Sequence, residues 1–122
     1  MGVLIVDDAM FLRILLKDIF KNNGYDVIGE ASDGYDAIQK YTELKPSLVT
    51  LDITMPSMNG IEALQKILEI DPSAIVIMCS AMGRNDFIEE ALKLGAKGFI
   101  TKPFKEDTIM EEVERVLKEC KE

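Results

Sequence analysis

Five short apolar runs alternate with segments of helical periodicity, and this alternation constrains the fold more than any other feature of the chain. The runs cover residues 3–6, 26–30, 48–51, 74–79 and 98–101. Most are continuously apolar, as expected for strands that helices cover on both faces. Strict alternation of strand and helix predicts an α/β fold, a doubly wound five-stranded parallel sheet with right-handed crossovers.

The segments between the runs have the apolar spacing of amphipathic helices. Asp33 and Asn59 are suited to begin helices as N-caps, and Gly24 and Gly95 are suited to end them. The predicted apolar faces are, in chain order, Leu12, Leu15, Leu16, Ile19 and Phe20; Ala37, Ile38 and Tyr41; Ile61, Leu64, Ile67 and Leu68; Phe87, Ile88, Ala91 and Leu92; and Ile109, Val113, Val116, Leu117 and Cys120.

Composition limits the classes of function. The chain has 122 residues, enough for one domain with its own core, so we expect a single domain over residues 1–122. A net charge of −8 disfavours binding to nucleic acid or to anionic membranes and indicates protein partners. No apolar stretch is long enough for a membrane span, and Cys79 and Cys120 are typical of a reducing compartment, so we expect a cytoplasmic location. Histidine is absent, so any chemistry has to use carboxylates, hydroxyls, lysines or hard metal ions.

Polar residues follow the predicted strands where each strand ends. Asp7 and Asp8 end the first strand, Asp52 the third and Ser80 the fourth, and the fifth leads into Lys102. In open parallel sheets, ligands bind beyond the carboxyl ends of the strands, where the strand order reverses. With the flavodoxin-like order 2-1-3-4-5, the first and third strands flank this point, so the three carboxylates are expected to converge.

Three carboxylates in one crevice repel one another unless a cation is present. Oxygen ligands without histidine or cysteine favour a hard divalent ion, and Mg²⁺ is the natural choice. Ser80 adds a hydroxyl donor and Lys102 a compact positive charge. Together these groups predict a site for a phosphoryl group, with a carboxylate as the nucleophile.

Each of these residues also has an ordinary structural explanation. Asp7 or Asp8 alone is often the N-cap of the following helix, and Ser80 before a glycine-containing turn is often a turn residue. Lys102 alone is mostly a solvated lysine. The coincidence of four suitable groups at successive strand ends favours the functional interpretation.

Four segments carry a specific resemblance: DDAMFLR (7–13), LDITMPSMNG (51–60), MCSAMG (78–83) and GAKGFITKPF (95–104). With this order and spacing, the whole chain resembles the receiver domain of two-component response regulators. Within that family it is most similar to the single-domain chemotaxis regulators of the non-enteric type. The resemblance implies that Asp52 accepts a phosphoryl group from a histidine kinase.

The resemblance also assigns the neighbouring residues. It implies that Asp7 and Asp8 hold Mg²⁺ together with Asp52 and the backbone carbonyl of Thr54. It implies that Ser80 bonds to the phosphoryl oxygen and moves towards it.

It further implies that Lys102 pairs with the phosphoryl group and that the Lys102–Pro103 peptide bond is cis. The family's aromatic switch falls at Phe99, although a lone aromatic residue in a strand is more often part of the core. Thr54 and Met82 occupy positions that tune hydrolysis, and an apolar Met82 is expected not to shorten the lifetime of the phosphoryl group. Pro56 and Gly60 are expected to shape the loop beside Asp52.

The expected partners follow from the same resemblance. The leading hypothesis is a monomeric messenger that a CheA-like histidine kinase phosphorylates, that a phosphatase dephosphorylates, and that docks on a motility-switch protein or adaptor. Because no DNA-binding module follows the fifth helix, output is expected by docking to another protein. The resemblance implies that the docking face is formed by the fourth helix, fifth strand and fifth helix. Exposed residues are expected there at Arg84, Glu89, Lys93, Lys97, Glu111 and Lys118.

Two other classes of function stay open at this point. A phosphorelay intermediate would pass its phosphoryl group to a histidine phosphotransfer protein. An enzyme of another class is disfavoured, because Asp52-Ile53-Thr54 lacks the second aspartate of dehalogenase-type phosphatases and no glycine-rich nucleotide loop is present. We therefore expect no enzyme activity beyond the chain's own phosphorylation and dephosphorylation.

Overall fold

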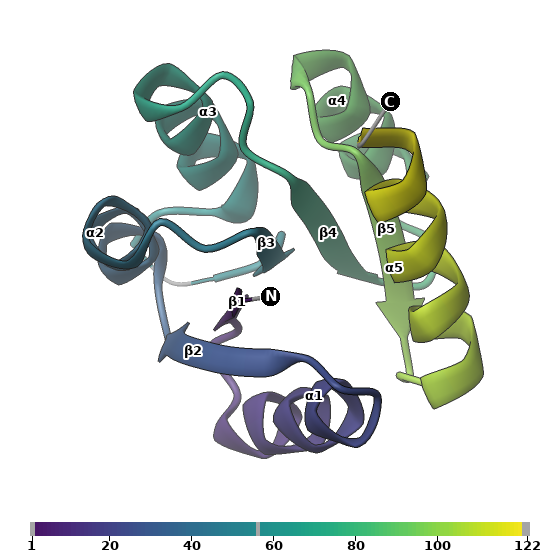
Figure 1. Cartoon of the computed structure of the whole chain (residues 1–122). Helices are drawn as coiled ribbons and strands as arrows, with labels where there is room; N and C mark the ends of the chain where they lie inside the picture. Colours follow the sequence, from purple (N-terminus) through teal and green to yellow (C-terminus); the bar gives the residue numbers. More distant parts are fainter. Residues whose placement is uncertain (1, 56, 121–122) are drawn as a thin grey trace.

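The computed structural model describes residues 2–55 and 57–120 as a parallel five-stranded sheet with five helices (Figure 1). The strand order is β2-β1-β3-β4-β5, so the predicted α/β fold and order are confirmed. The strands are β1 (Gly2–Val6), β2 (Asp26–Ala31), β3 (Leu48–Asp52), β4 (Val76–Ala81) and β5 (Gly98–Lys102). The helices are α1 (Met10–Asn22), α2 (Gly34–Leu44), α3 (Gly60–Ile70), α4 (Asn85–Leu94) and α5 (Glu106–Cys120).

Two apolar cores lie on the two faces of the sheet. Figure 1 shows α1 and α5 on one face and α2, α3 and α4 on the other. The core beneath α1 and α5 includes Phe20, Ile77 and Ile109, and the opposite core includes Leu51 and Leu64. Every residue of β3 is buried, because this strand lies between β1 and β4 and helices cover both of its faces. Central burial of β3 brings its last residue, Asp52, to the edge of the sheet without exposing it to solvent.

Three residues of the predicted apolar faces are exposed, and a fourth, Leu12, is half-buried but belongs to neither core. Leu15 and Leu92 are each 40% exposed, and Cys120 is also exposed. Leu15 borders the solvent side of α1, Leu92 borders that of α4, and Cys120 is the last residue of α5. The prediction that these three belong to the core is wrong.

The boundary of β4 also differs from the prediction. The strand begins at Val76 and not at Ala74, because the backbone N–H of Ala74 bonds to the carbonyl of Asp71 in the turn after α3. It continues to Ala81 and therefore includes Ser80.

The predicted helix ends are confirmed by hydrogen bonds and by backbone geometry. The side chain of Asp33 accepts from the N–H of Asp36 at 2.8 Å, and that of Asn59 accepts from the N–H of Glu62 at 3.0 Å. Gly95 ends α4 with φ +123°, a conformation that favours glycine. Among the helices of residues 2–55 and 57–120, none combines the length and the apolar character needed to cross a bilayer.

Candidate functional site

Three carboxylates meet where β1 and β3 end side by side. β1 pairs with both β2 and β3, so the strand order reverses at this point. Asp7 and Asp8 follow β1, and Asp52 is the last residue of β3. One carboxylate oxygen from each lies within 4.8 Å of the others. The convergence predicted from the strand ends is therefore present in the structure.

The fifth strand adds a cation to this crevice. The Nζ atom of Lys102 lies 3.4 Å from Oδ2 of Asp7 and 3.4 Å from Oδ2 of Asp52. The two carboxylates are almost fully buried, whereas a quarter of the Lys102 side chain is exposed. One ammonium group therefore faces two buried carboxylates, and Asp8 contributes a third, exposed carboxylate. Lys102 is not merely a solvated lysine.

The alternative that Asp7 or Asp8 caps α1 does not hold. The N-cap of α1 is Ala9, and no side chain caps this helix end. Oδ1 of Asp7 instead accepts a hydrogen bond from the N–H of Ala9 at 2.9 Å. Its buried Oδ2 accepts no hydrogen bond from the part of the chain that the structure describes.

These groups fit a hard divalent cation. Oδ2 of Asp7 is a buried carboxylate oxygen that, among the described residues, faces only the Lys102 ammonium, at 3.4 Å, and it lies beside two further carboxylates. Such a cluster has the oxygen chemistry that Mg²⁺ prefers. The cluster is also one positive charge short of neutrality even when only Asp7 and Asp52 are counted against Lys102.

Electrostatics make Asp52 unusual. Burial, followed by repulsion from Asp7, raises the pKa of Asp52 to about 6, although Lys102 and the N–H of Thr54 act in the opposite direction. The pKa of Lys102 is also raised, because attraction to Asp52 and Asp7 outweighs the effect of its burial. Asp52 is therefore ionised at neutral pH but poorly neutralised, which suits a nucleophile that gains from an added cation.

Ser80 lies inside β4, so it is not a turn residue. It is 2% exposed, and its hydroxyl donates to the carbonyl of Ala81 at 2.9 Å. The Ser80 hydroxyl makes no hydrogen bond to Asp52; β-sheet pairing places Cys79, its neighbour in sequence, opposite Asp52. Ser80 thus lies at the same edge of the sheet as Asp52, and its hydroxyl bonds to the main chain.

Of the two positions predicted to tune hydrolysis, Thr54 contacts Asp52 and Met82 lines a hollow beside Lys102. The N–H of Thr54 lies 3.4 Å from Oδ1 of Asp52, and the Thr54 residue is exposed. Met82 lies in the turn after β4 and is 75% exposed. The metal contact of the Thr54 carbonyl stays a prediction.

Phe99 is not a core residue. It lies on β5, the last strand of the sheet, and is 41% exposed. Three residues farther along, the Lys102–Pro103 peptide bond is cis, the isomer that the resemblance implied. The exposed ring leaves Phe99 available for the switch role predicted for it.

The loop after Asp52 depends on Gly60. The N–H of Gly60 donates to the carbonyl of Ile53 at 2.7 Å, and a Cβ atom at Gly60 would collide with the carbonyl oxygen of Asp52. Ser57 in the same loop has φ +68°. Gly60 thus shapes the loop as predicted, whereas Pro56 lies outside the described residues.

Arg13 is a site residue to which the sequence interpretation gave no role. Its Nη1 donates to the backbone carbonyl of Asp7 at 2.7 Å, and its Nε pairs with Oε1 of Glu30 at 2.8 Å. Arg13 thereby fixes the main chain of Asp7 between α1 and β2. The sequence feature that could have indicated this role is the basic residue six positions after Asp7, in the segment DDAMFLR.

The predicted output face is largely exposed. Glu89, Lys93, Lys97, Glu111 and Lys118 are exposed as expected. Arg84 is only half-exposed, because its guanidinium lies 4.3 Å from the centre of the Phe87 ring. The expectation of an exposed Arg84 is therefore wrong.

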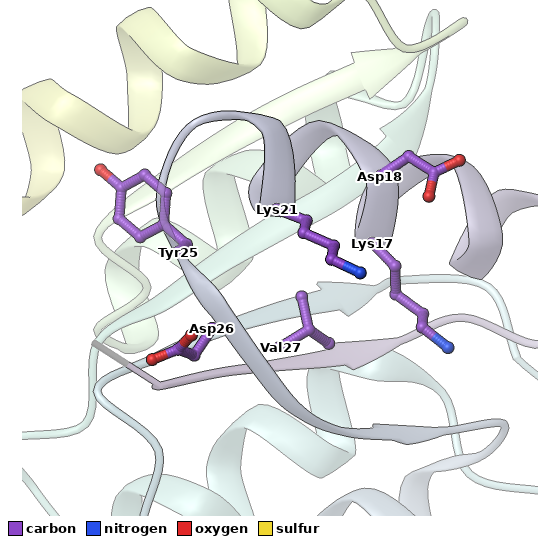
Figure 2. A pocket seen from close by; sticks show the side chains of 6 residues that line it. All are labelled: Lys17, Asp18, Lys21, Tyr25, Asp26 and Val27. Carbon is purple, nitrogen blue, oxygen red and sulfur yellow. The ribbon is translucent and has the colours of Figure 1, made fainter.

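A separate hollow of about 310 Å³ lies at the start of β2, away from the carboxylates (Figure 2). Lys17, Asp18 and Lys21 line it from α1, and Tyr25, Asp26 and Val27 from the following segment. Its charges are of both signs, and Lys17 is paired with Glu30 at 2.7 Å. It contains none of the predicted site residues.

Comparison with known proteins decides the family. The profile of the response regulator receiver domain matches residues 3–114. The chain belongs to the response regulator receiver domain family. As a receiver domain, it carries its acidic pocket at Asp7, Asp8 and Asp52, the kind of pocket at which receiver domains bind Mg²⁺.

Individual relatives narrow the type of receiver. Chemotaxis protein CheY of Thermotoga maritima is 55% identical over 95% of this chain and 97% of its own length. CheY of Bacillus subtilis is 50% identical over 94% of this chain and 96% of its own length. A chain in the crystal structure of the CheX–CheY–BeF₃–Mg²⁺ complex of Borrelia burgdorferi is 42% identical, with a TM-score of 0.92, and the match covers 95% of this chain and 88% of that one. These findings support a response regulator of two-component signalling of the chemotaxis type, as predicted from the sequence.

Proposed function

We propose that this receiver accepts a phosphoryl group on Asp52 and signals by docking to a motility protein. The observation that carries the proposal is the position of Asp52, a buried carboxylate with a raised pKa between Asp7 and Lys102. Asp7, Asp8, Asp52 and the carbonyl of Thr54 would hold Mg²⁺. When bound, the ion supplies positive charge to the phosphoryl oxygens.

The chemical step needs no general base. An ionised Oδ of Asp52 attacks phosphorus and forms an O–P bond, while the bond from phosphorus to the phosphohistidine nitrogen of the donor breaks and its electrons leave with the imidazole. Lys102 loses half of its present ion pairing when Asp52 is phosphorylated, so its ammonium is free to pair with the phosphoryl oxygens. The Ser80 hydroxyl, at the end of the next strand, exchanges the Ala81 carbonyl for a phosphoryl oxygen.

The same residues set the output and its duration. The move of Ser80 vacates space at the end of β4, and the exposed Phe99 ring on the neighbouring strand turns inwards. Thr54 borders the path of an attacking water, and the apolar Met82 does not orient one, so hydrolysis is not accelerated from that side. The protein acts only on its own phosphoryl group and not as an enzyme for other substrates.

The partners are proposed from the relatives. A CheA-like histidine kinase would be the donor in the cytoplasm, and a motility-switch protein or adaptor would bind the monomer at α4, β5 and α5. The Borrelia burgdorferi structure contains CheX with CheY, BeF₃ and Mg²⁺, which supports a further partner that binds a phosphorylated state, such as a phosphatase.

The decisive test is phosphotransfer followed by capture. A CheA-like kinase carrying ³²P would be mixed with the wild type, with Asp52→Asn, and with Asp26→Asn as an exposed control at the opposite edge of the sheet. Label on the wild type and the control, but not on Asp52→Asn, is expected. Phosphorylation-dependent binding to a motility-switch component supports the messenger, whereas onward transfer of label to a histidine phosphotransfer protein would replace it with a phosphorelay role.

A further inference from the structure

Two side chains of α5 cover the free edge of β5. The N–H of Phe99 donates to Oε2 of Glu112 at 2.9 Å, and Nη2 of Arg115 donates to the carbonyl of Lys97 at 3.3 Å. β5 is the last strand in the sheet, so these backbone groups have no neighbouring strand. Glu112 and Arg115 thus provide one acceptor and one donor, as the peptide groups of an added strand would.

The two side chains hold each other in place. Nε and Nη2 of Arg115 each lie 2.9 Å from one carboxylate oxygen of Glu112, the fork-like geometry that gives charged hydrogen bonds their direction. Nη1 of Arg115 also bonds to Glu119 at 2.6 Å, one turn farther along α5. Burial alone would raise the pKa of Glu112, but hydrogen bonds from Arg115 and Phe99 outweigh it and hold the pKa below its usual value.

Gly98 leaves the space that this arrangement needs. A Cβ atom at Gly98 would lie 2.5 Å from Oε2 of Glu112 and 2.8 Å from Cγ2 of Val116. Any larger residue would therefore push the Glu112 carboxylate away from the Phe99 amide. The hydrogen bond between Glu112 and the Phe99 amide therefore depends on glycine at position 98.

The anchored residue is the exposed aromatic. Phe99 lines a hollow of about 460 Å³, and its other walls include Thr108, Glu112 and Arg115. The side chains that bond to the β5 backbone therefore also form the wall beside the ring. Figure 1 shows α5 running alongside β5, so the helix is placed to act on this edge.

We propose that Glu112 and Arg115 form a latch that fixes the main chain of Phe99 and seats its ring in the exposed arrangement. The inference rests on the proposed function only in giving Phe99 a switch role. Both residues are positioning residues: they leave Asp52 chemistry alone and set how readily Phe99 leaves its exposed position. When the bonds from Glu112 and Arg115 are lost, the edge of β5 becomes free and one wall of the hollow beside the ring is removed. The Phe99 ring then populates other positions before any phosphorylation.

The test uses two measurements on the unphosphorylated protein. Amide hydrogen exchange at Phe99 reports the latch, and a ¹⁹F NMR signal from 4-fluorophenylalanine in place of Phe99 reports the ring. In Glu112→Ala we expect exchange at Phe99 to be at least about tenfold faster and the fluorine signal to shift or split. Glu112→Gln, which keeps an acceptor oxygen, should restore part of the protection, and Glu114→Ala, an exposed residue of α5, should match the wild type in both.

Two results would overturn the inference. Equal exchange at Phe99 in the wild type and Glu112→Ala would show that no latch exists. Lost protection with an unchanged fluorine signal would show that the pair only supports the strand. If Glu112→Ala does not fold, Arg115→Lys removes the fork while keeping the charge and should give the same two changes. Failure of the proposed function would appear separately, as absence of phosphate uptake in the wild type, because neither measurement involves phosphate.

Discussion

The ammonium group of Lys102 lies 3.4 Å from Oδ2 of Asp52 and the same distance from Oδ2 of Asp7. The three residues come from the ends of three different strands, so the contact joins β1, β3 and β5 at one edge of the sheet. A single positive charge is shared by two buried negative charges. Lys102 therefore holds the crevice together, but its single positive charge does not neutralise both carboxylates.

Removing that charge should cost both stability and function. In Lys102→Met the two buried carboxylates lose their cation, and we expect the free energy of unfolding at pH 7 to fall by about 2 kcal/mol. Phosphate uptake from a small acyl phosphate should slow at least tenfold, since the phosphoryl oxygens lose their partner. Urea denaturation and intact-protein mass spectrometry measure the two effects. Lys105→Met, an exposed neighbour, is the control, and equal behaviour of the two variants would contradict the role of Lys102.

The raised pKa of Asp52 predicts a stability that depends on pH. The pKa is about 6 in the folded protein and about 3.9 in an unfolded chain. Between these values the folded protein holds more protons, so the free energy of unfolding falls as pH rises from about 4 to 6 and stays low above. Asp52→Asn cannot ionise and avoids this loss. We expect it to be more stable than the wild type by about 3 kcal/mol at pH 7 without Mg²⁺, and no more stable at pH 4.

Urea denaturation at both pH values measures this difference. A variant that is equally stable or less stable at pH 7 would contradict the buried, poorly neutralised state of Asp52. Asp26→Asn, whose side chain is exposed, should show no pH-dependent gain.

Magnesium should stabilise the folded protein through the same carboxylates. A ligand that binds only the folded state raises its stability by an amount that grows with ligand concentration. We expect Mg²⁺ to raise the unfolding temperature of the wild type and EDTA to reverse the change. Asp7→Asn should lose the response, because it removes the buried carboxylate whose Oδ2 accepts no hydrogen bond from the described residues. Calorimetry or thermal melting measures the response to Mg²⁺. A full response in Asp7→Asn would place the ion elsewhere.

A buried hydroxyl in β3 gives a prediction about stability alone. Thr50 is fully buried, and its hydroxyl has no hydrogen-bond partner among the described residues. Valine has nearly the same shape and no polar group to desolvate, so Thr50→Val should raise the free energy of unfolding by about 1 kcal/mol. Chemical denaturation measures the change, with Thr42→Val on the exposed side of α2 as the comparison. A loss of stability in Thr50→Val would indicate a partner for the hydroxyl, such as a buried water.

Much of the fold and of the site followed from local sequence signals. The apolar runs predicted five strands, and the polar residues at their ends predicted the convergence of Asp7, Asp8 and Asp52, because parallel strands all end at the same edge. Lys102 followed by the same reasoning. These signals are local, and the topology of a parallel sheet alone brings the residues at the strand ends together.

Other features depend on contacts that no local pattern records. Leu15 and Leu92 fit an apolar helix face by spacing, but how far the sheet extends beneath each helix decides whether they are covered. The role of Arg13 depends on the approach of α1 to β2 and Glu30. The bond from Glu112 to the Phe99 amide depends on the free edge of β5, which is known only once the strand order is known.

Intact-protein mass spectrometry tests most directly whether Asp52 takes up a phosphoryl group with Mg²⁺. The wild type and Asp52→Asn would each be mixed with a small acyl phosphate in the presence of Mg²⁺ or of EDTA, and folding would be checked by circular dichroism. We expect the mass of one phosphoryl group on the wild type with Mg²⁺, and none with EDTA or on the variant. A folded wild type that stays at its original mass, or a variant that gains the same mass, would contradict the account.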